Sequence, residues 1–151
     1  MEIIVNEWLL EYLRPDAQES ERLAAFRFVN ALVKKCDKMV IKRNSPFVAK
    51  FYRFWKQVES DTNFKQPFSK LHQLVFRDTD KTIIVDESDL QDLPEDIAAK
   101  TPEDDKYLIE LWYSNQGRIV LTTDAKLRDK LKDIPGLKIC LLQEFLREYL
   151  V

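Results

Sequence analysis

Glycine is nearly absent from this 151-residue chain, which contains only Gly117 and Gly136. Neither a G-x-G-x-x-G nor a G-x-x-x-x-G-K-[ST] motif can be built from them, so the sequence lacks the Rossmann and P-loop nucleotide-binding motifs. The chain has one histidine, His72, and two cysteines, Cys36 and Cys140. This composition argues against a zinc site with four Cys or His ligands and against a disulfide framework. A Ser-His-Asp triad would have to use His72, and no G-x-S-x-G motif surrounds any serine.

Long hydrophobic runs are also lacking, because no apolar stretch approaches the roughly 18 residues that span a bilayer. The opening residues, 1–6, have neither the basic region nor the apolar stretch of a signal peptide. We therefore expect a cytoplasmic protein with no membrane segment and with reduced cysteines. Hydrophobic residues make up 45% of the chain and aromatic residues 11%, which is enough apolar material for a core in a single domain over 1–151.

The small net charge of −2 hides two opposed blocks. Residues 34–56 contain eight Lys or Arg and one acid, whereas residues 78–105 contain eleven acids and two Lys. A basic face can follow a phosphate backbone, and an acidic cluster can hold divalent cations. The alternative for each block is an ordinary solvated surface.

Hydrophobic patterning predicts an alternation of strands and helices. The expected strands are 2–5, 39–41, 118–122 and 137–141, and the expected helices are 7–13, 16–35, 46–58, 101–114, 124–132 and 143–150. Asp16, Thr101 and Asp124 are the expected N-terminal caps. Residues 59–70 are polar and predict a loop, while 71–85 fit either a hairpin or a helix followed by a strand. The alternation implies a parallel sheet with helices on both faces, in which 3–5 and 118–122 are neighbouring central strands.

Acidic residues occur where the predicted strands end and where the helix before the strand at 118–122 begins. Glu7 follows the first strand, Asp124 follows the strand 118–122, and Asp104 and Asp105 open the preceding helix. Ligands of such sheets bind at the carboxyl ends of the strands. Converging carboxylates there would suit Mg²⁺ or Mn²⁺, which prefer oxygen ligands and can activate a water for attack on a phosphodiester.

Three segments resemble the PIN-domain family of metal-dependent nucleases. Residues 3–13 resemble its opening strand and helix, 105–111 resemble its D-x-x-[IL] helix, and 119–124 resemble its strand ending in T-x-D. The resemblance implies a three-layer α/β/α sandwich with a central, mainly parallel sheet. It also implies a Mg²⁺- or Mn²⁺-dependent endoribonuclease. The sequence departs from the family pattern at Asn6, where the first acid normally stands, and near Lys50, where the second is expected.

The resemblance assigns roles to particular residues. The catalytic residues would be Asp105, Asp124 and Asp104, and the metal ligands would be Asp105, Asp124, Glu7 and Asn6. The basic block would bind RNA through Lys42, Arg43, Lys50 and Arg53. Many family members are toxin halves of toxin–antitoxin pairs, so the implied partners are RNA, a protein inhibitor or antitoxin, and a second copy of the chain.

Two alternatives stay open at the level of sequence. One is a degenerate PIN-like module that binds RNA or protein without cleaving, which Asn6 and Lys50 favour. The other is an unrelated α/β interaction domain in which the acids only cap helices, since Asp104 and Asp124 both lie at predicted helix starts.

Overall fold

The computed structural model describes residues 1–60 and 62–150 and joins five short strands in one sheet, in the order β3-β2-β1-β4-β5. The strands are β1 (Glu2–Val5), β2 (Lys38–Lys42), β3 (Thr82–Val85), β4 (Ile119–Thr122) and β5 (Lys138–Leu141). All neighbouring pairs are parallel, and Ile4 of β1 is paired with Val40 of β2 and Val120 of β4. The prediction that 3–5 and 118–122 are neighbouring parallel strands is therefore confirmed.

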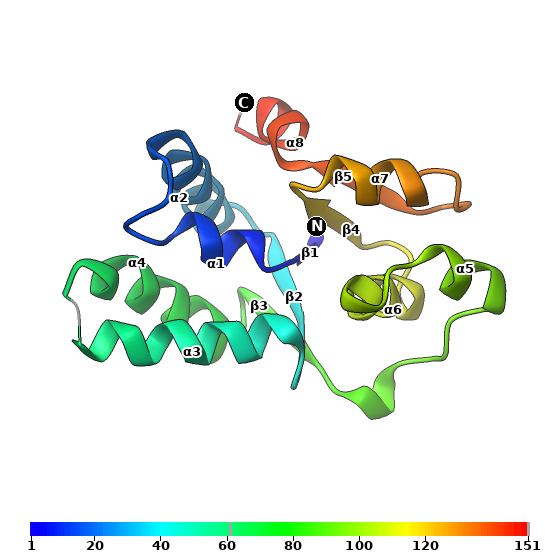
Figure 1. Ribbon diagram of the computed structural model, residues 1–151, viewed down its shortest axis with the longest axis horizontal. Coiled ribbons are helices and arrows are strands. Elements are labelled where there is room, and N and C mark those ends of the chain that lie inside the picture. Colours follow the sequence, from blue (N-terminus) through cyan, green and yellow to red (C-terminus); the bar gives the residue numbers. More distant parts are fainter. Residues whose placement is uncertain (61, 151) are drawn as a thin grey trace.

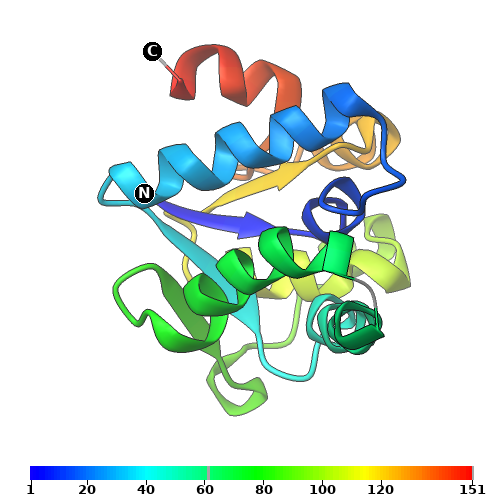
Figure 2. The same cartoon turned by 90° about the vertical axis from the view of Figure 1, so that its left-hand side faces the viewer.

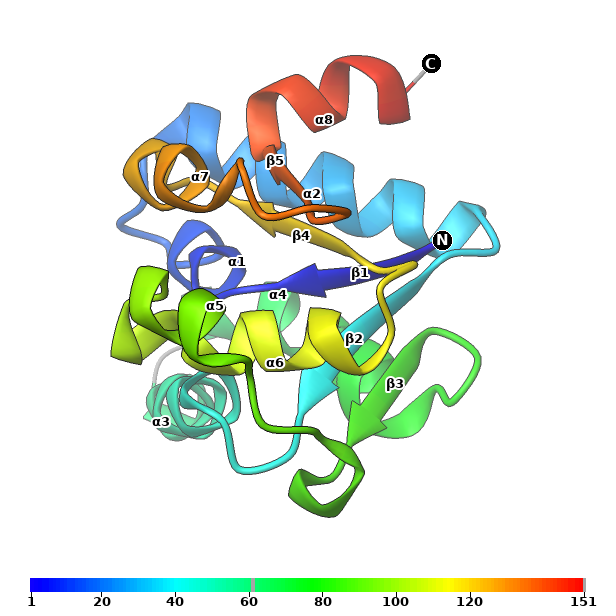
Figure 3. The same cartoon turned by 90° about the vertical axis from the view of Figure 1, so that its right-hand side faces the viewer.

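Helices cover both faces of this sheet, which confirms the three-layer α/β/α architecture. Helices α2 and α4 lie on one face (Figure 2), whereas α6 and α7 lie on the other (Figure 3). Helix α8 packs against α2 (Figure 1). The bounds of the helices are α1 (Trp8–Tyr12), α2 (Glu19–Lys34), α3 (Pro46–Ser60), α4 (Thr62–His72), α5 (Glu95–Lys100), α6 (Lys106–Ser114), α7 (Ala125–Leu131) and α8 (Leu142–Tyr149).

The order of the strands creates a switch point between β1 and β4. The chain proceeds outward from β1 to β2 and β3, and then returns to the other side of β1 for β4 and β5. The connecting helices therefore change faces at the β1–β4 pair. In open parallel sheets, the crevice beyond the carboxyl ends of two such strands is the usual place for a ligand.

The central strands are apolar because the sheet is buried on both sides. Ile3, Ile4 and Val120 are fully buried, as expected for parallel strands covered by helices on both faces. Within the described part of the chain, no helix combines the length and apolarity needed to cross a membrane.

The predicted loop over 59–70 is wrong, because α4 occupies most of that segment. Phe68 and Leu71 of α4 are fully buried, whereas the polar residues around them and Pro67 obscured the helical pattern in the sequence. A π-helical turn, Gln73–Arg77, continues from α4. Strand β3 then pairs in parallel with β2, so the hairpin alternative for 71–85 is wrong and the helix-then-strand alternative is confirmed.

Two of the three predicted caps are also wrong. Helix α2 begins at Glu19 with a capping box between Gln18 and Glu21, while Asp16 pairs with Arg14 instead. Gln18 is the N-cap residue instead. Its side chain accepts from the backbone N–H of Glu21, and the Glu21 side chain accepts from the backbone N–H of Gln18, so the helix start is capped without Asp16.

Thr101 ends a helix rather than starting one. Its hydroxyl donates to the carbonyl of Ile97 in α5, a helix that the sequence analysis did not anticipate. A 3₁₀ turn, Glu103–Asp105, then leads into α6. Asp124 caps α7 as predicted, since its Oδ1 accepts from the backbone N–H groups of Lys126 and Leu127 at 3.0 and 3.1 Å.

Candidate functional site

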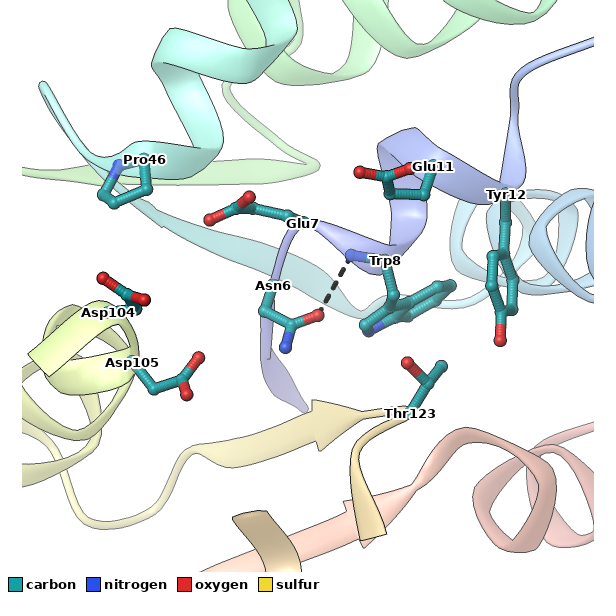
Figure 4. Close-up of a pocket in the computed structure, with 9 residues that line it drawn as sticks. All are labelled: Asn6, Glu7, Trp8, Glu11, Tyr12, Pro46, Asp104, Asp105 and Thr123. Atoms are coloured by element: carbon teal, nitrogen blue, oxygen red, sulfur yellow. Dashed lines mark hydrogen bonds between the residues drawn. The ribbon is translucent and has the colours of Figure 1, made fainter. Parts of the chain in front are cut away.

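A pocket of about 590 Å³ opens beyond the carboxyl ends of β1 and β4, at the switch point of the sheet. Figure 4 shows the carboxylates of Asp104 and Asp105 entering from one wall, with Glu7 and Asn6 facing them. The sheet topology thus brings together residues about 100 positions apart in sequence. The lining residues are Asn6, Glu7, Trp8, Glu11, Tyr12, Pro46, Asp104, Asp105 and Thr123.

Asn6 connects the end of β1 to the end of β4. Its side-chain Oδ1 accepts from the backbone N–H of Trp8 at 3.1 Å, and its Nδ2 donates to the Thr122 hydroxyl at 3.3 Å. The same hydroxyl accepts from the backbone N–H of Asp124 at 3.1 Å. Asn6 therefore has a structural role at the position where the resemblance expects an acid, and one lone pair of its amide oxygen is already used.

Trp8 fixes α1 beside the pocket and is not among the site residues predicted from the sequence. Its indole Nε1 donates to the carbonyl of Leu121 in β4 at 2.9 Å, and its ring meets Phe28 edge to face. The side chain is only 5% exposed. A large aromatic residue directly after a strand end, on a short helix, was the available signal.

Asp105 is the most electrostatically strained acid of the pocket. Half-burial raises the pKa of its carboxyl, and the negative charges of Asp124, Asp104 and Glu7 raise it further, in that order. The charges of these three acids therefore all act on Asp105, while the convergence of the four carboxylates on one ion stays a prediction. Within the described residues, no ion pair compensates Asp104, Asp105 or Asp124.

Asp124 contributes charge to the site without lining the pocket. Its side chain is exposed and turned toward the first turn of α7, which it caps. The capping interpretation of Asp124 is therefore correct, yet its charge still reaches Asp105. The two interpretations of this residue are compatible.

Glu7 and Glu11 share a cationic partner that Asp104 and Asp105 lack among the described residues. Lys50 of α3 places its Nζ 3.1 Å from Glu7 Oε2, and the same ammonium bonds Glu11. The Lys50 side chain is only 16% exposed. Although burial lowers the pKa of this ammonium, its contacts with Glu11 and Glu7 raise it above the usual value, which keeps the charge in place.

Tyr107 of α6 provides a buried polar atom close to the pocket acids. Its hydroxyl is buried and has no hydrogen-bond partner in the described structure. Burial raises the pKa of Tyr107 strongly, and the charges of Glu7 and Asp105 add to the effect. Tyr107 does not line the pocket, so its hydroxyl senses the charges of Glu7 and Asp105 from within the protein. Sequence spacing alone could not find it, because Tyr107 fits the apolar stripe of α6.

Acids already pair with three of the four cations predicted to bind RNA. Lys42 contacts Glu87 at 2.5 Å and Glu110 at 3.8 Å, and Arg43 contacts Asp86 at 2.5 Å. Lys50 is paired as described above. Arg53 is exposed on α3 and forms no ion pair with any described residue. The acidic block around 86–89 thus neutralises part of the basic block.

The donor atoms of the pocket are oxygens, which suits a hard cation. In the part of the chain that the structure describes, no three His, Cys, Asp or Glu residues are grouped as a ready metal site. Mg²⁺ commonly binds through one or two carboxylates, several waters and substrate phosphates. Asp104 and Asp105 fit that mode of binding, because they offer two carboxylates, which is fewer protein ligands than a fully preformed metal site has.

Comparisons with known proteins find no matching family model and no matching curated protein. Among solved structures, the chain is similar to a crystal structure of VapBC2 from Rickettsia felis bound to a DNA fragment from its promoter. The alignment covers 93% of this chain and 98% of the other, at 12% sequence identity and a TM-score of 0.48. Such low values leave the function to be argued from the site itself.

Proposed function

We propose that this protein is a PIN-like, divalent-metal-dependent ribonuclease whose centre is the acidic pocket at the β1–β4 switch point. One observation carries the proposal: Asp104, Asp105 and Glu7 line a single pocket, and the charge of Asp124 reaches Asp105. No ion pair relieves the repulsion on the Asp105 side in the described residues. A bound cation would relieve it.

Each residue of the proposed centre would have its own role. Asp105 and Asp104 would hold Mg²⁺ or Mn²⁺. Asp124 would contribute negative charge near the ion without lining the pocket. When bound, the ion would supply polarisation of the phosphodiester and activation of a water. Asn6 would keep the two strand ends in register, and it would serve as a neutral ligand only after its amide oxygen turned from the Trp8 backbone N–H toward the ion.

The RNA backbone would cross the basic end of α3 beside the pocket. Arg53 is exposed there and available to a phosphate. Lys42 and Arg43 would have to exchange Glu87 and Asp86 for phosphates. We therefore expect RNA binding to be weak and to fall with salt concentration, with a shallow slope because few phosphates are contacted and each releases only its own counterions.

Asp105→Asn tests the proposed centre through two effects of opposite sign. Without metal, the variant should be more stable by up to about 1 kcal/mol, because one repelling charge is gone. In contrast, it should bind Mn²⁺ at least about tenfold more weakly, because divalent affinity depends on ligand charge, and it should lose cleavage of a labelled single-stranded RNA. Urea unfolding, calorimetric Mn²⁺ titration and gel analysis measure the three quantities.

Asp133→Asn is the matched control, since Asp133 is exposed after α7 and does not line the pocket. It removes the same charge and should leave Mn²⁺ binding and cleavage unchanged. If wild type binds no Mn²⁺ at millimolar concentration and cleaves no RNA, the nuclease proposal is wrong.

A second candidate function is a module that binds RNA or a protein partner, such as an inhibitor or antitoxin, without cleaving. The pairing of Lys50 with Glu7 and Glu11 favours it, because an ammonium already compensates two of the acids that line the pocket. This candidate predicts salt-dependent RNA retention or partner binding that is the same with Mn²⁺ and with EDTA.

A further inference from the structure

The acids of the pocket form two sides: on the compensated side the carboxylates pair with a cation, and on the uncompensated side they do not. Glu7 and Glu11, both from the start of the chain, share the Lys50 ammonium. Asp104 and Asp105, from the turn before α6, have no cationic partner among the described residues. Glu7 lies between the two sides, because it contacts Lys50 and its charge also acts on Asp105.

Lys50 is held in this position by more than charge. Its side chain is largely covered, with 16% exposed, and its ammonium lies 6.0 Å from the centre of the Phe54 ring. Helix α3 packs against α1, which carries Glu11, so the three charged groups come from two helices in contact. The ammonium is therefore held beside the pocket, against two of the acids that line it.

A buried polar atom lies near the uncompensated side. The Tyr107 hydroxyl is buried, has no hydrogen-bond partner among the described residues, and lies close to Glu7 and Asp105. Buried hydroxyls are nearly always satisfied by protein or by ordered solvent. Tyr107 itself does not line the pocket, so a bound cation would affect this hydroxyl through the charges of Glu7 and Asp105 and not by direct contact.

We propose that Lys50 is an internal competitor of the divalent cation and sets how tightly the pocket binds it. In the present arrangement Lys50 engages Glu7, so an entering ion meets only Asp104 and Asp105. Replacing Lys50 by a neutral residue releases Glu7 as a third carboxylate and removes a like charge from beside the ion. The inference rests on the proposed function, in that the pocket must take a divalent cation.

The test compares Mn²⁺ affinity in wild type, Lys50→Gln and Lys50→Arg by calorimetric titration. Lys50→Gln should bind Mn²⁺ about tenfold or more tightly than wild type, because removing one unit charge near a divalent ion at a protein surface changes affinity by at least that factor. Lys50→Arg keeps the charge and should stay within about threefold of wild type.

Lys56→Gln is the matched control, because Lys56 is exposed on the same helix and has no ion pair among the described residues. It should leave the affinity unchanged. If Lys50→Gln does not fold, as judged by circular dichroism, Lys50→Met keeps the aliphatic stem against Phe54 and gives the same comparison.

The outcomes separate this inference from the proposed function. Equal Mn²⁺ affinity in wild type and Lys50→Gln would overturn the competitor role alone. An equal gain in Lys56→Gln would do the same, because a general charge effect would explain it. Absence of Mn²⁺ binding from wild type, Lys50→Gln and Lys50→Met would overturn both the inference and the cation site.

Discussion

At the scale of single residues, the strand ends of the pocket are held by a short chain of polar contacts. Asn6 donates to Thr122, and Thr122 in turn accepts from the backbone of Asp124. Thr122 is fully buried, so its hydroxyl connects two strands where no water reaches it. The positions of the pocket acids therefore depend on neutral neighbours as well as on their own backbone.

Substitutions of Asp124 should separate its role as the cap of α7 from its contribution of charge to the site. Asp124→Asn keeps an oxygen that can cap α7, since Asn and Asp are comparable N-caps, and stability should change by less than about 0.5 kcal/mol. Asp124→Ala removes the cap and should cost about 1 kcal/mol. Both variants should lose metal-dependent cleavage. Urea unfolding and an RNA-cleavage assay check these outcomes, and normal cleavage by Asp124→Asn would restrict the residue to capping.

Tyr107→Phe should not destabilise the metal-free protein, although the residue is buried. The hydroxyl has no partner among the described residues, so its removal relieves a buried unsatisfied group and should raise the free energy of unfolding by up to about 1 kcal/mol. Tyr113→Phe on the same helix is the control and should have little effect. A loss of more than about 1 kcal/mol in Tyr107→Phe would mean that the hydroxyl is bonded in solution.

At the scale of elements, α1 is short and depends on Trp8 for its position. The five residues of α1 are too few to form a stable helix alone. The Trp8 indole contacts Phe28 of α2 and Leu121 of β4, which fixes α1 between them. The orientation of Glu7 and Glu11 toward the pocket follows from that anchoring.

Trp8→Phe should therefore cost more stability than Trp112→Phe. Both substitutions shrink a buried ring, but only Trp8 leaves a carbonyl, that of Leu121, without its donor, which adds about 1–3 kcal/mol. The indole N–H of Trp112 has no hydrogen-bond partner in the part of the chain that the structure describes. Guanidinium unfolding of the two variants measures the difference, and equal losses would show that the hydrogen bond contributes nothing net.

The elements also show which parts of the fold the sequence could predict. Continuous apolar strands such as 3–5 and 119–122 can be predicted from the sequence, because burial on both faces leaves no place for polar residues. Helix α4 could not be predicted from the sequence, because Pro67 and polar neighbours surround its few buried residues and hide the helical pattern. The acids Asp104 and Asp105 could be assigned to a strand-end site from topology, whereas the Lys50–Glu7 pair could not. It depends on how α3 lies against α1 in three dimensions.

At the scale of the whole molecule, Asp37 connects distant parts of the chain. Burial raises the pKa of its carboxyl, but the Met1 ammonium and the Tyr149 hydroxyl outweigh that effect and hold the pKa below its usual value. Met1 N lies 2.5 Å from Asp37 Oδ1, and the Tyr149 hydroxyl donates to Oδ2 at 2.8 Å. One carboxylate thus joins the start of β1 to α8.

The stabilising contribution of Asp37 should depend on pH with a defined sign. A carboxyl whose pKa is lower in the folded state contributes fully above its unfolded pKa of about 3.9, and the contribution disappears as the pH falls through the lower folded value. Asp37→Asn should lower the free energy of unfolding by about 1–2 kcal/mol at pH 7 and by much less near pH 2. Unfolding curves at several pH values test this. A difference that persists unchanged at pH 2 would assign the loss to packing.

The central place of β1 has a consequence for synthesis on the ribosome. Strand β1 is made first and can pair early with β2, but its other neighbour, β4, ends at Thr122. At about 5–20 residues per second, the β4 edge of β1 stays open for several seconds after β2 has been made. We expect nascent chains to gain protease resistance only once β4 has left the exit tunnel. Until then the apolar edge of Ile3 and Ile4 is a natural substrate for chaperones.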